Sequence, residues 1–194
     1  MIRHFEKRDL PSVIDIWNET VLCGEVLYRP IDAEYYNKKF EQDPNYDPRF
    51  VFVAEDENEV IGFIHGTSKK IMLKGESNTS SPGYLTCIFV RRDKRNCGVG
   101  TRLLLRLQDE FKSAGKTKFE CGGGNPINID WIIPGTLGHD HNNAPGVDIE
   151  CMGYPFLLSN DFEDLVREVA MYIDLSKYKP WEKLDDKRAE LLEQ

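Results

Sequence analysis

The chain has 194 residues, with 33 acidic against 25 Lys and Arg side chains, so its formal net charge is −8. This acidic balance argues against general binding to nucleic acid or to anionic membranes, since both attract basic surfaces. Hydrophobic residues make up 40% of the chain, which excludes disorder throughout and supports one folded core. We expect a single domain over residues 1–178, followed by a charged C-terminal helix or linker over 179–194.

Localisation signals are absent from the sequence pattern. Charged residues interrupt every apolar run near the N-terminus, so neither a signal peptide nor a transit peptide is expected. No window approaches the roughly 18 apolar residues of a membrane span. The five cysteines never form a CxxC pair, which argues against a disulfide framework and a zinc site. These features predict a cytoplasmic protein.

The first elements follow from short-range patterns. Alternation over residues 2–6 predicts a strand, and Asp9 with Pro11 favours a helix start there. A second helix is predicted over residues 31–40, with Asp32 as its N-cap.

The middle of the chain combines strands with one long helix. The β-rich runs 50–54 and 60–64 flank a polar turn and predict an antiparallel hairpin. Residues 74–83 lack large apolar side chains and predict a loop, whereas 84–90 predicts a strand. A helix is expected over 98–113. Its apolar face consists of Val99, Leu103, Leu104, Leu107 and Phe111.

The last third is less regular. A strand is predicted over 117–121, and a Gly, Pro and Asn-rich stretch follows over 122–146. Loops of that length are usually functional or disordered. A short helix over 150–158 and a strand over 169–175 are expected before the charged C-terminal segment.

A glycine pattern lies between the strand at 84–90 and the long helix. The segment reads Arg95-Asn-Cys-Gly98-Val-Gly100-Thr, where unpaired amides and the positive end of the helix dipole favour an anion. Two glycines let a phosphate approach the backbone, and the four cations in 91–95 add positive charge. A phosphate site is therefore predicted. The alternative is that the glycines only ease a tight turn.

The pattern Arg95-x-x-Gly98-x-Gly100 after Ile88-Phe-Val90 resembles the signature of the GNAT superfamily of acyl-CoA-dependent N-acyltransferases. The order of predicted elements resembles that family over most of the chain. The resemblance implies a mixed α/β fold of the α+β type. Its central sheet would be mixed and mostly antiparallel, flanked by helices, with strands splayed at the CoA site.

The resemblance also implies acetyl-CoA as co-substrate and no metal. Backbone amides of 95–101 would hold the CoA pyrophosphate, and main-chain groups of Ile88 and Val90 would bond the pantetheine arm. The implied CoA-binding residues are Ile88, Phe89, Val90, Arg95, Asn96, Cys97, Gly98, Val99, Gly100 and Thr101.

Two departures from the family pattern stand out. About two dozen residues, 125–148, form an insertion that resembles those of mycothiol-synthase-type and tandem acetyltransferases, so this chain could be one half of a tandem arrangement. In addition, family members often carry a Tyr that protonates the leaving thiolate, and here that position is Leu157.

Acyl transfer to an amine requires a base, a polarised carbonyl and a proton for the thiolate. Candidates for the base by position are Glu120 on the last predicted strand before the insertion, and His139, Asp140, His141 and Asp148 within it; of these we select Glu120, His139 and Asp148. The amide of Val90 is the expected donor to the carbonyl oxygen. His65 lies within a predicted strand and is expected to be a hydrogen-bonded structural residue.

The insertion supplies the candidates for acceptor binding. We assign this role to Asn125, Trp131 and His141, although Trp131 could equally plug the core. His139 and His141 could instead bind a metal together with Asp148, but solvated loop residues are the plainer interpretation, and no metal is expected.

These observations predict an N-acetyltransferase that moves an acetyl group from acetyl-CoA to a primary amine of a small molecule or protein. The negative charge favours a cationic acceptor such as a polyamine, an aminoglycoside or a lysine side chain. One alternative is a catalytically silent acyl-CoA-binding sensor or regulatory module. Another is a partner-binding module that uses the C-terminal helix, and a homodimer is possible. No nucleic-acid or membrane partner is expected.

Overall fold

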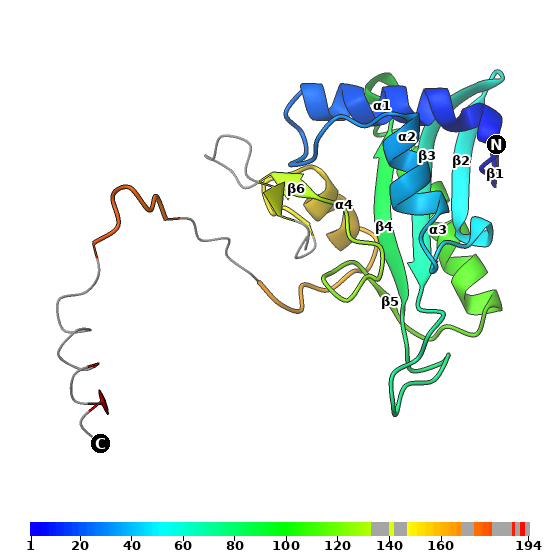
Figure 1. The fold of residues 1–194 in the computed structure, drawn as a ribbon. Coiled ribbons are helices and arrows are strands. Elements are labelled where there is room, and N and C mark those ends of the chain that lie inside the picture. Colours follow the sequence, from blue (N-terminus) through cyan, green and yellow to red (C-terminus); the bar gives the residue numbers. More distant parts are fainter. Residues whose placement is uncertain (133–139, 142–146, 168–172, 180–187, 189–190, 193–194) are drawn as a thin grey trace.

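The computed structural model describes residues 1–132, 140–141, 147–167, 173–179, 188 and 191–192 (Figure 1). Its main sheet has five strands in the order β1-β2-β3-β4-β5. These strands are β1 (Ile2–His4), β2 (Val51–Asp56), β3 (Glu59–Ser68), β4 (Gly83–Val90) and β5 (Phe119–Glu120). A separate two-stranded sheet joins β6 (Trp131–Ile132) to β7 (Asp140–His141).

Helices connect these strands. The α-helices are α1 (Leu10–Leu22), α2 (Ala33–Tyr36), α3 (Val99–Ser113) and α4 (Gly153–Leu158). A π-helical turn, η2 (Asn37–Glu41), extends α2, and three 3-10 turns are η1 (Lys7–Asp9), η3 (Pro48–Phe50) and η4 (Arg92–Lys94). Among the described residues, no helix is long and apolar enough to cross a membrane.

The sheet is antiparallel from β1 to β4 and parallel only between β4 and β5. This arrangement confirms the predicted mixed, mostly antiparallel fold flanked by helices. The β4–β5 pairing is short, joining Gly83 to Phe119 and Tyr84 to Glu120. The predicted strand over 117–121 is therefore confirmed in type but is shorter than expected.

Strand alternation divides the apolar side chains between two cores, one on each face of the sheet. Helices α1 and α2 cover one face of the sheet and α3 covers the other (Figure 1). Val53, Phe63 and Phe89 pack in the core on the α1 and α2 face, whereas Phe52 and Ile64 pack in the core on the α3 face. All five predicted apolar positions of α3 are buried. The helical period of 3.6 residues thus placed the long helix correctly on the sheet.

Local signals fixed several element ends as the sequence predicts. The Asp32 carboxylate accepts a hydrogen bond from the Tyr35 amide at 2.8 Å and caps α2. Just after the C-terminus of α3, Gly115 adopts a left-handed conformation with a φ of +80°. The Lys116 amide then bonds the Phe111 carbonyl at 2.9 Å, which closes the helix end with a Schellman motif.

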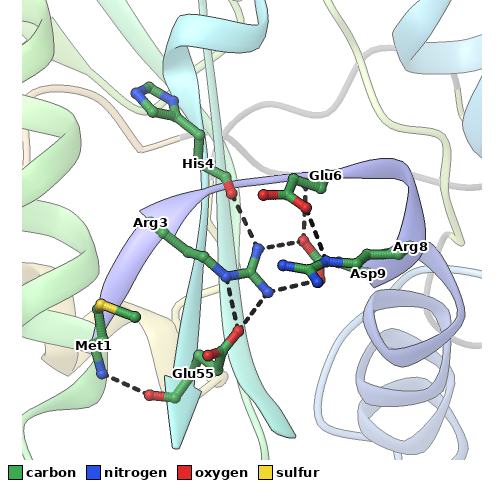
Figure 2. A network of polar contacts seen from close by, with 7 residues as sticks. All are labelled: Met1, Arg3, His4, Glu6, Arg8, Asp9 and Glu55. Carbon is green, nitrogen blue, oxygen red and sulfur yellow. Dashed lines mark hydrogen bonds and ion pairs between the residues drawn. The ribbon is translucent and has the colours of Figure 1, made fainter. Parts of the chain in front are cut away.

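Asp9 has a larger role than the predicted helix start. Its carboxylate receives two hydrogen bonds from Arg3, at 2.7 and 2.8 Å, and one from the Glu6 amide at 2.8 Å (Figure 2). The same guanidinium donates to Glu55 at 2.6 and 2.7 Å. Burial alone would raise the pKa of Asp9, but the bonds from Arg3 and from the Glu6 amide outweigh it and lower that pKa. Arg3 therefore ties β1 to both α1 and β2.

The insertion forms structure of its own. β6 and β7 pair as a hairpin that joins Trp131 to His141. On its other edge, Trp131 forms a bridge with Tyr28, and the Ile132 amide donates to the Leu27 carbonyl at 2.6 Å. The insertion is thus fastened to the connection between α1 and α2.

Two predictions near the C-terminus are largely untested. Residues 168–172 of the predicted strand lie outside the described part of the chain, and residues 173–175 are not in a strand. Most of the predicted C-terminal helix also falls outside the described residues, so the division into 1–178 and 179–194 stays a prediction.

Replacing Arg3 tests its place in this network. Arg3→Met should lower the free energy of unfolding by about 3 kcal/mol, because it leaves the buried Asp9 carboxylate without its cation. Arg8→Met is the control, since Arg8 pairs with Glu6 at the surface and should change stability by less than about 0.5 kcal/mol. Urea unfolding measures both. Equal losses in the two variants would contradict the role assigned to Arg3.

Candidate active site

The segment before α3 forms a concave row of backbone amides. Gly98 is the N-cap of α3 with a φ of +75°, and Asn96 also has a positive φ, of +57°. Within the described part of the chain, no acceptor pairs with the amides of 98–101, since the first bond of the helix runs from Arg102 to the Gly98 carbonyl at 3.1 Å. Alternating left-handed and right-handed backbone of this kind forms an anion-binding nest.

We call the unpaired amides of 98–101 the cradle. Its two glycines, Gly98 and Gly100, contribute to it in different ways. A Cβ at Gly98 would meet nothing within 4 Å, so this glycine is required by its left-handed backbone and not by crowding. At Gly100, a Cβ would lie 3.1 Å from the ring of Phe156. The first turn of α3 is thus closely packed against α4 on one side and open at Gly98.

Side-chain charge contributes less to the cradle than the sequence suggests. Arg91 pairs with Glu59 and Asp93, and Lys94 pairs with Asp56. The carboxylate of Glu25 holds the other two cations, Arg92 at 3.0 Å and Arg95 at 2.6 Å. The expectation that the basic loop adds free positive charge is therefore wrong. Apart from Asp93, its partners are acidic residues distant in sequence, which the composition of the loop alone does not reveal.

The anion attraction therefore comes mainly from the backbone and the helix dipole. One cation remains nearby: Arg102, exposed in the first turn of α3, has no ion-pair partner among the described residues.

Next to the cradle, the outer edge of β4 is open. The Arg91 amide donates to the Ile61 carbonyl of β3, so the main-chain groups of Phe89 and Arg91 face β3. By alternation, those of Ile88 and Val90 face the opposite side. There the Val90 carbonyl accepts a bond from Arg95 Nε at 2.9 Å. No acceptor for the Val90 amide is found among the described residues, so this amide can still serve a ligand.

Farther along β4, its pairing with β3 is irregular. The β3–β4 register skips Thr86, because His65 pairs with Cys87 and the next pair joins Gly66 to Leu85. Thr86 is thus the extra residue of a β-bulge, a feature that is common beside active sites. A small cavity of about 20 Å³ lies here, lined by Tyr28, Thr86 and Cys121, among others.

The three candidate bases lie apart. Glu120 is on β5 beside Tyr84, at the end of β4 remote from the cradle. The Asp148 carboxylate accepts a bond from the Glu150 amide at 2.9 Å and stabilises a turn ahead of α4. His139 lies outside the described residues. The structure therefore does not bring Glu120 and Asp148 together, and each remains a separate prediction for the base.

The three candidate acceptor-binding residues have defined places in the fold. Asn125 is buried; its Nδ2 donates to the Thr86 hydroxyl at 3.1 Å, and its Oδ1 accepts a bond from the Ile127 amide at 2.9 Å. Trp131 and His141 pair across the β6–β7 hairpin. Asn125 thus fastens the segment after β5 to the β4 bulge, and contact of any of these residues with an acceptor stays a prediction.

Leu157, which occupies the position of the frequent family Tyr, is buried against the α3 core. The nearby Tyr154 directs its hydroxyl to Asp164 at 3.0 Å, and Arg167 donates to the same hydroxyl at 3.4 Å. Tyr154 is therefore engaged at the surface end of α4. Among the described residues, no cluster of His, Cys, Asp and Glu could hold a metal ion.

On the α1 and α2 face of the sheet, a histidine of β3 lies beside the β4 bulge. His65 is fully buried, and neither of its ring nitrogens has a hydrogen-bond partner among the described residues. Its ring lies 4.9 Å from that of Phe40 and 5.9 Å from that of Tyr46. The expectation of a hydrogen-bonded histidine is wrong, and burial lowers the pKa of His65 to about 3.

Comparison with known protein families and structures identifies the family of this chain. Residues 12–131 match the model of the Acetyltransferase (GNAT) family. The chain therefore belongs to the GNAT acetyltransferase family. Among curated protein sequences, no significant match is found.

Three solved structures share the fold over most of the chain. An aminoglycoside antibiotic 6'-N-acetyltransferase from Acinetobacter haemolyticus has a TM-score of 0.55 and 14% identity, covering 90% of this chain and 99% of that one. A transcriptional regulator from Bacillus halodurans has a TM-score of 0.55 and 16% identity, covering 89% and 99%. An aminoglycoside N-acetyltransferase in complex with CoA has a TM-score of 0.51 and 16% identity, covering 90% and 98%. At this identity, the likeness establishes the fold alone.

The buried histidine has a measurable consequence for stability. Because the pKa of His65 is lower in the folded chain than in the unfolded chain, the unfolded state binds an additional proton below about pH 6.5. Folding stability should then fall by roughly 1.4 kcal/mol per pH unit as the pH decreases from 6.5 toward 3.

Urea unfolding of the wild type and His65→Leu at pH 7 and pH 5 tests this dependence. The variant should lose about 2 kcal/mol less than the wild type between the two conditions. The same loss in both proteins would show that the pKa of His65 is not lowered in the folded chain.

Proposed function

We propose that this protein is an acyl-CoA-dependent acetyltransferase that transfers an acetyl group from acetyl-CoA to a primary amine. The observation that carries the proposal is the row of unpaired amides at 98–101, placed beside the open edge of β4. An anionic group with an extended polar arm fits this pair of features. Membership of the GNAT family and the CoA bound in one structural neighbour support the same assignment.

In this proposal the backbone binds the donor. The amides from Arg95 to Thr101, with the helix dipole, hold the pyrophosphate, and Asn96, Cys97 and Val99 contribute main-chain groups. Main-chain groups of Ile88 and Val90 accompany the pantetheine arm, and Phe89, whose own main-chain groups face β3, lies between them. The Val90 carbonyl already accepts a bond from Arg95, so of the main-chain groups of Val90 only the amide is left for the donor.

The chemistry then follows from charge development. The amine attacks the thioester carbonyl, and negative charge gathers on the carbonyl oxygen, where the Val90 amide donates a hydrogen bond. The amine must be neutral to attack, and a lysine-like amine has a pKa near about 10. Glu120, His139 or Asp148, acting directly or through water, would take its proton.

The acceptor is proposed by class only. A net charge of −8 favours a cation, and two structural neighbours are aminoglycoside acetyltransferases. We therefore propose a polyamine, an aminoglycoside or a lysine side chain as acceptor, held near Asn125, Trp131 and His141. A cytoplasmic location suits these acceptors.

Acetyl-CoA should stabilise the folded protein. At a concentration 100 times its dissociation constant, the ligand should add about 2.7 kcal/mol to the free energy of unfolding, a shift of several degrees in Tm. Gly98→Glu should abolish this shift, because it places a carboxylate among the amides of the cradle. Thermal unfolding with and without acetyl-CoA measures the effect.

Gly75→Glu provides the matched control. Gly75 also has a positive φ, of +92°, and open space around its Cβ position, but it lies in the loop between β3 and β4. This variant carries the same backbone strain and the same charge, and its acetyl-CoA shift should equal that of the wild type. Loss of the shift in both variants, or no shift in the wild type, would overturn the donor site.

A screen of amines separates an enzyme from a silent sensor. Release of CoA thiol from acetyl-CoA should rise above the rate of hydrolysis with at least one cationic amine among aminoglycosides, polyamines and lysine peptides. Binding of acetyl-CoA without thiol release for any amine would favour the sensor.

A further inference from the structure

Glu25 follows α1 at a position that the end of the helix determines. The helix closes with a Schellman motif, in which the Glu25 amide donates to the Thr20 carbonyl at 3.2 Å and the Gly24 amide donates to the Val21 carbonyl at 2.9 Å. Gly24 has the left-handed backbone that this motif requires, with a φ of +69°. The backbone of Glu25 is therefore tied to α1, and only its side chain remains to be oriented.

Two arginines orient the Glu25 side chain. Its Oε1 lies 3.0 Å from Arg92 Nε, and its Oε2 accepts a hydrogen bond from Arg95 Nη1 at 2.6 Å. The side chains of Glu25 and Arg95 are each only 19% exposed, whereas that of Arg92 is 51% exposed. A short, charge-assisted bond between two mostly buried groups is strong and directional. The Arg95 guanidinium is thus held from the connection between α1 and α2.

The same guanidinium also bonds β4. Arg95 Nε donates to the Val90 carbonyl at 2.9 Å. Because the guanidinium is planar and rigid, the bond that Glu25 accepts at Nη1 also fixes the direction of the N–H at Nε. A continuous link of hydrogen bonds therefore runs from the end of α1, through Glu25 and Arg95, to the end of β4. We call it the Glu25–Arg95–Val90 link.

Val90 has no neighbouring strand to hold its outer edge. It is the last residue of β4, and β5 pairs only with Gly83 and Tyr84 at the other end of that strand. On the inner edge, the Arg91 amide donates to the Ile61 carbonyl at 2.9 Å. The amide and the carbonyl of one strand residue lie on the same edge, so a bond that orients the Val90 carbonyl also orients the Val90 amide.

This orientation matters for the chemistry, in a step that rests on the proposed function. There the Val90 amide donates to the oxygen of the thioester carbonyl. A donor of this kind stabilises the transition state only if it is already directed at the place where negative charge develops. A displacement of about 1 Å in such a site can cost roughly 100-fold in rate.

We propose that Glu25 is a positioning residue for acyl transfer, which acts through Arg95 to direct the Val90 amide at the thioester carbonyl oxygen. Glu25 itself contacts neither acetyl-CoA nor the amine, and it neither gains nor loses a proton. The role belongs to the bond with Arg95. The side chain of Arg92 bonds Glu25 and Cys23 among the described residues and makes no contact with β4.

Infrared spectroscopy of bound acetyl-CoA tests this orientation without an acceptor amine. The thioester band is isolated as the difference between acetyl-CoA with and without an isotope label at the carbonyl carbon. A hydrogen bond from the Val90 amide weakens the carbonyl bond and lowers its stretching frequency relative to free acetyl-CoA. Glu25→Ala should lose at least half of this downshift, because Arg95 is no longer held. Arg92→Ala, the matched control, removes the other partner of Glu25 and should retain the downshift.

Turnover supplies the second readout once the amine screen yields an acceptor. Glu25→Ala should lower kcat by about 30-fold, less than the roughly 100-fold or more that removal of an oxyanion donor costs. The KM for acetyl-CoA should change little, because the cradle at 98–101 remains in place. Glu25→Gln keeps an oxygen acceptor for Arg95 and should recover part of kcat, and Arg92→Ala should retain it. An acetyl-CoA shift in thermal unfolding equal to that of the wild type would show that each variant is folded.

The proposal and the proposed function fail in distinguishable ways. An equal carbonyl downshift in the wild type and Glu25→Ala would overturn the role of Glu25 and leave acetyl transfer standing. The role would also be overturned if Arg92→Ala lost as much of the downshift as Glu25→Ala.

If the wild type binds acetyl-CoA but acetylates no amine, the proposed reaction fails, and a smaller downshift in Glu25→Ala still supports the link to Val90. If the wild type binds no acetyl-CoA, the donor site is overturned, and the positioning role of Glu25 is overturned with it.

Discussion

Two residue pairs join β4 to β5, and beyond them the strands part. A β-strand whose neighbour has left presents main-chain groups that must find other partners, because an unpaired buried amide is costly. Here the Asn125 side chain satisfies part of the edge near Thr86, and Arg95 satisfies the Val90 carbonyl. What remains open between them is the Ile88 and Val90 edge. The site exists because the sheet is left incomplete at this point.

The electrostatics of the cradle depend on how the charged side chains around it are paired. All four cations of the loop before α3 form ion pairs with carboxylates from other parts of the chain, and Glu25 alone serves two of them. These pairs fasten the loop to the connection between α1 and α2 and to the ends of β2 and β3 at their turn. The backbone amides at 98–101 then provide a directed attraction for an anion, which a mobile cation at the surface would not provide.

Local periodicity made much of this fold predictable. The apolar face of α3, the β2–β3 hairpin, the Asp32 cap and the glycines at 98 and 100 each depend on neighbours a few residues away. The ion pairs of Glu25, the burial of His65 without a partner and the position of Tyr28 could not be predicted in this way. Each of them is set by contacts between residues far apart in the sequence, for which a single sequence carries no periodic signal.

The insertion illustrates how such long-range contacts give a family fold a distinct site. β6 bonds the segment at Leu27 and Tyr28, so this segment of the connection between α1 and α2 gains a strand-like partner. That pairing fixes the direction of the Tyr28 ring, which Trp17 supports from the core side. The insertion thus orients a side chain that lies far from it in the sequence.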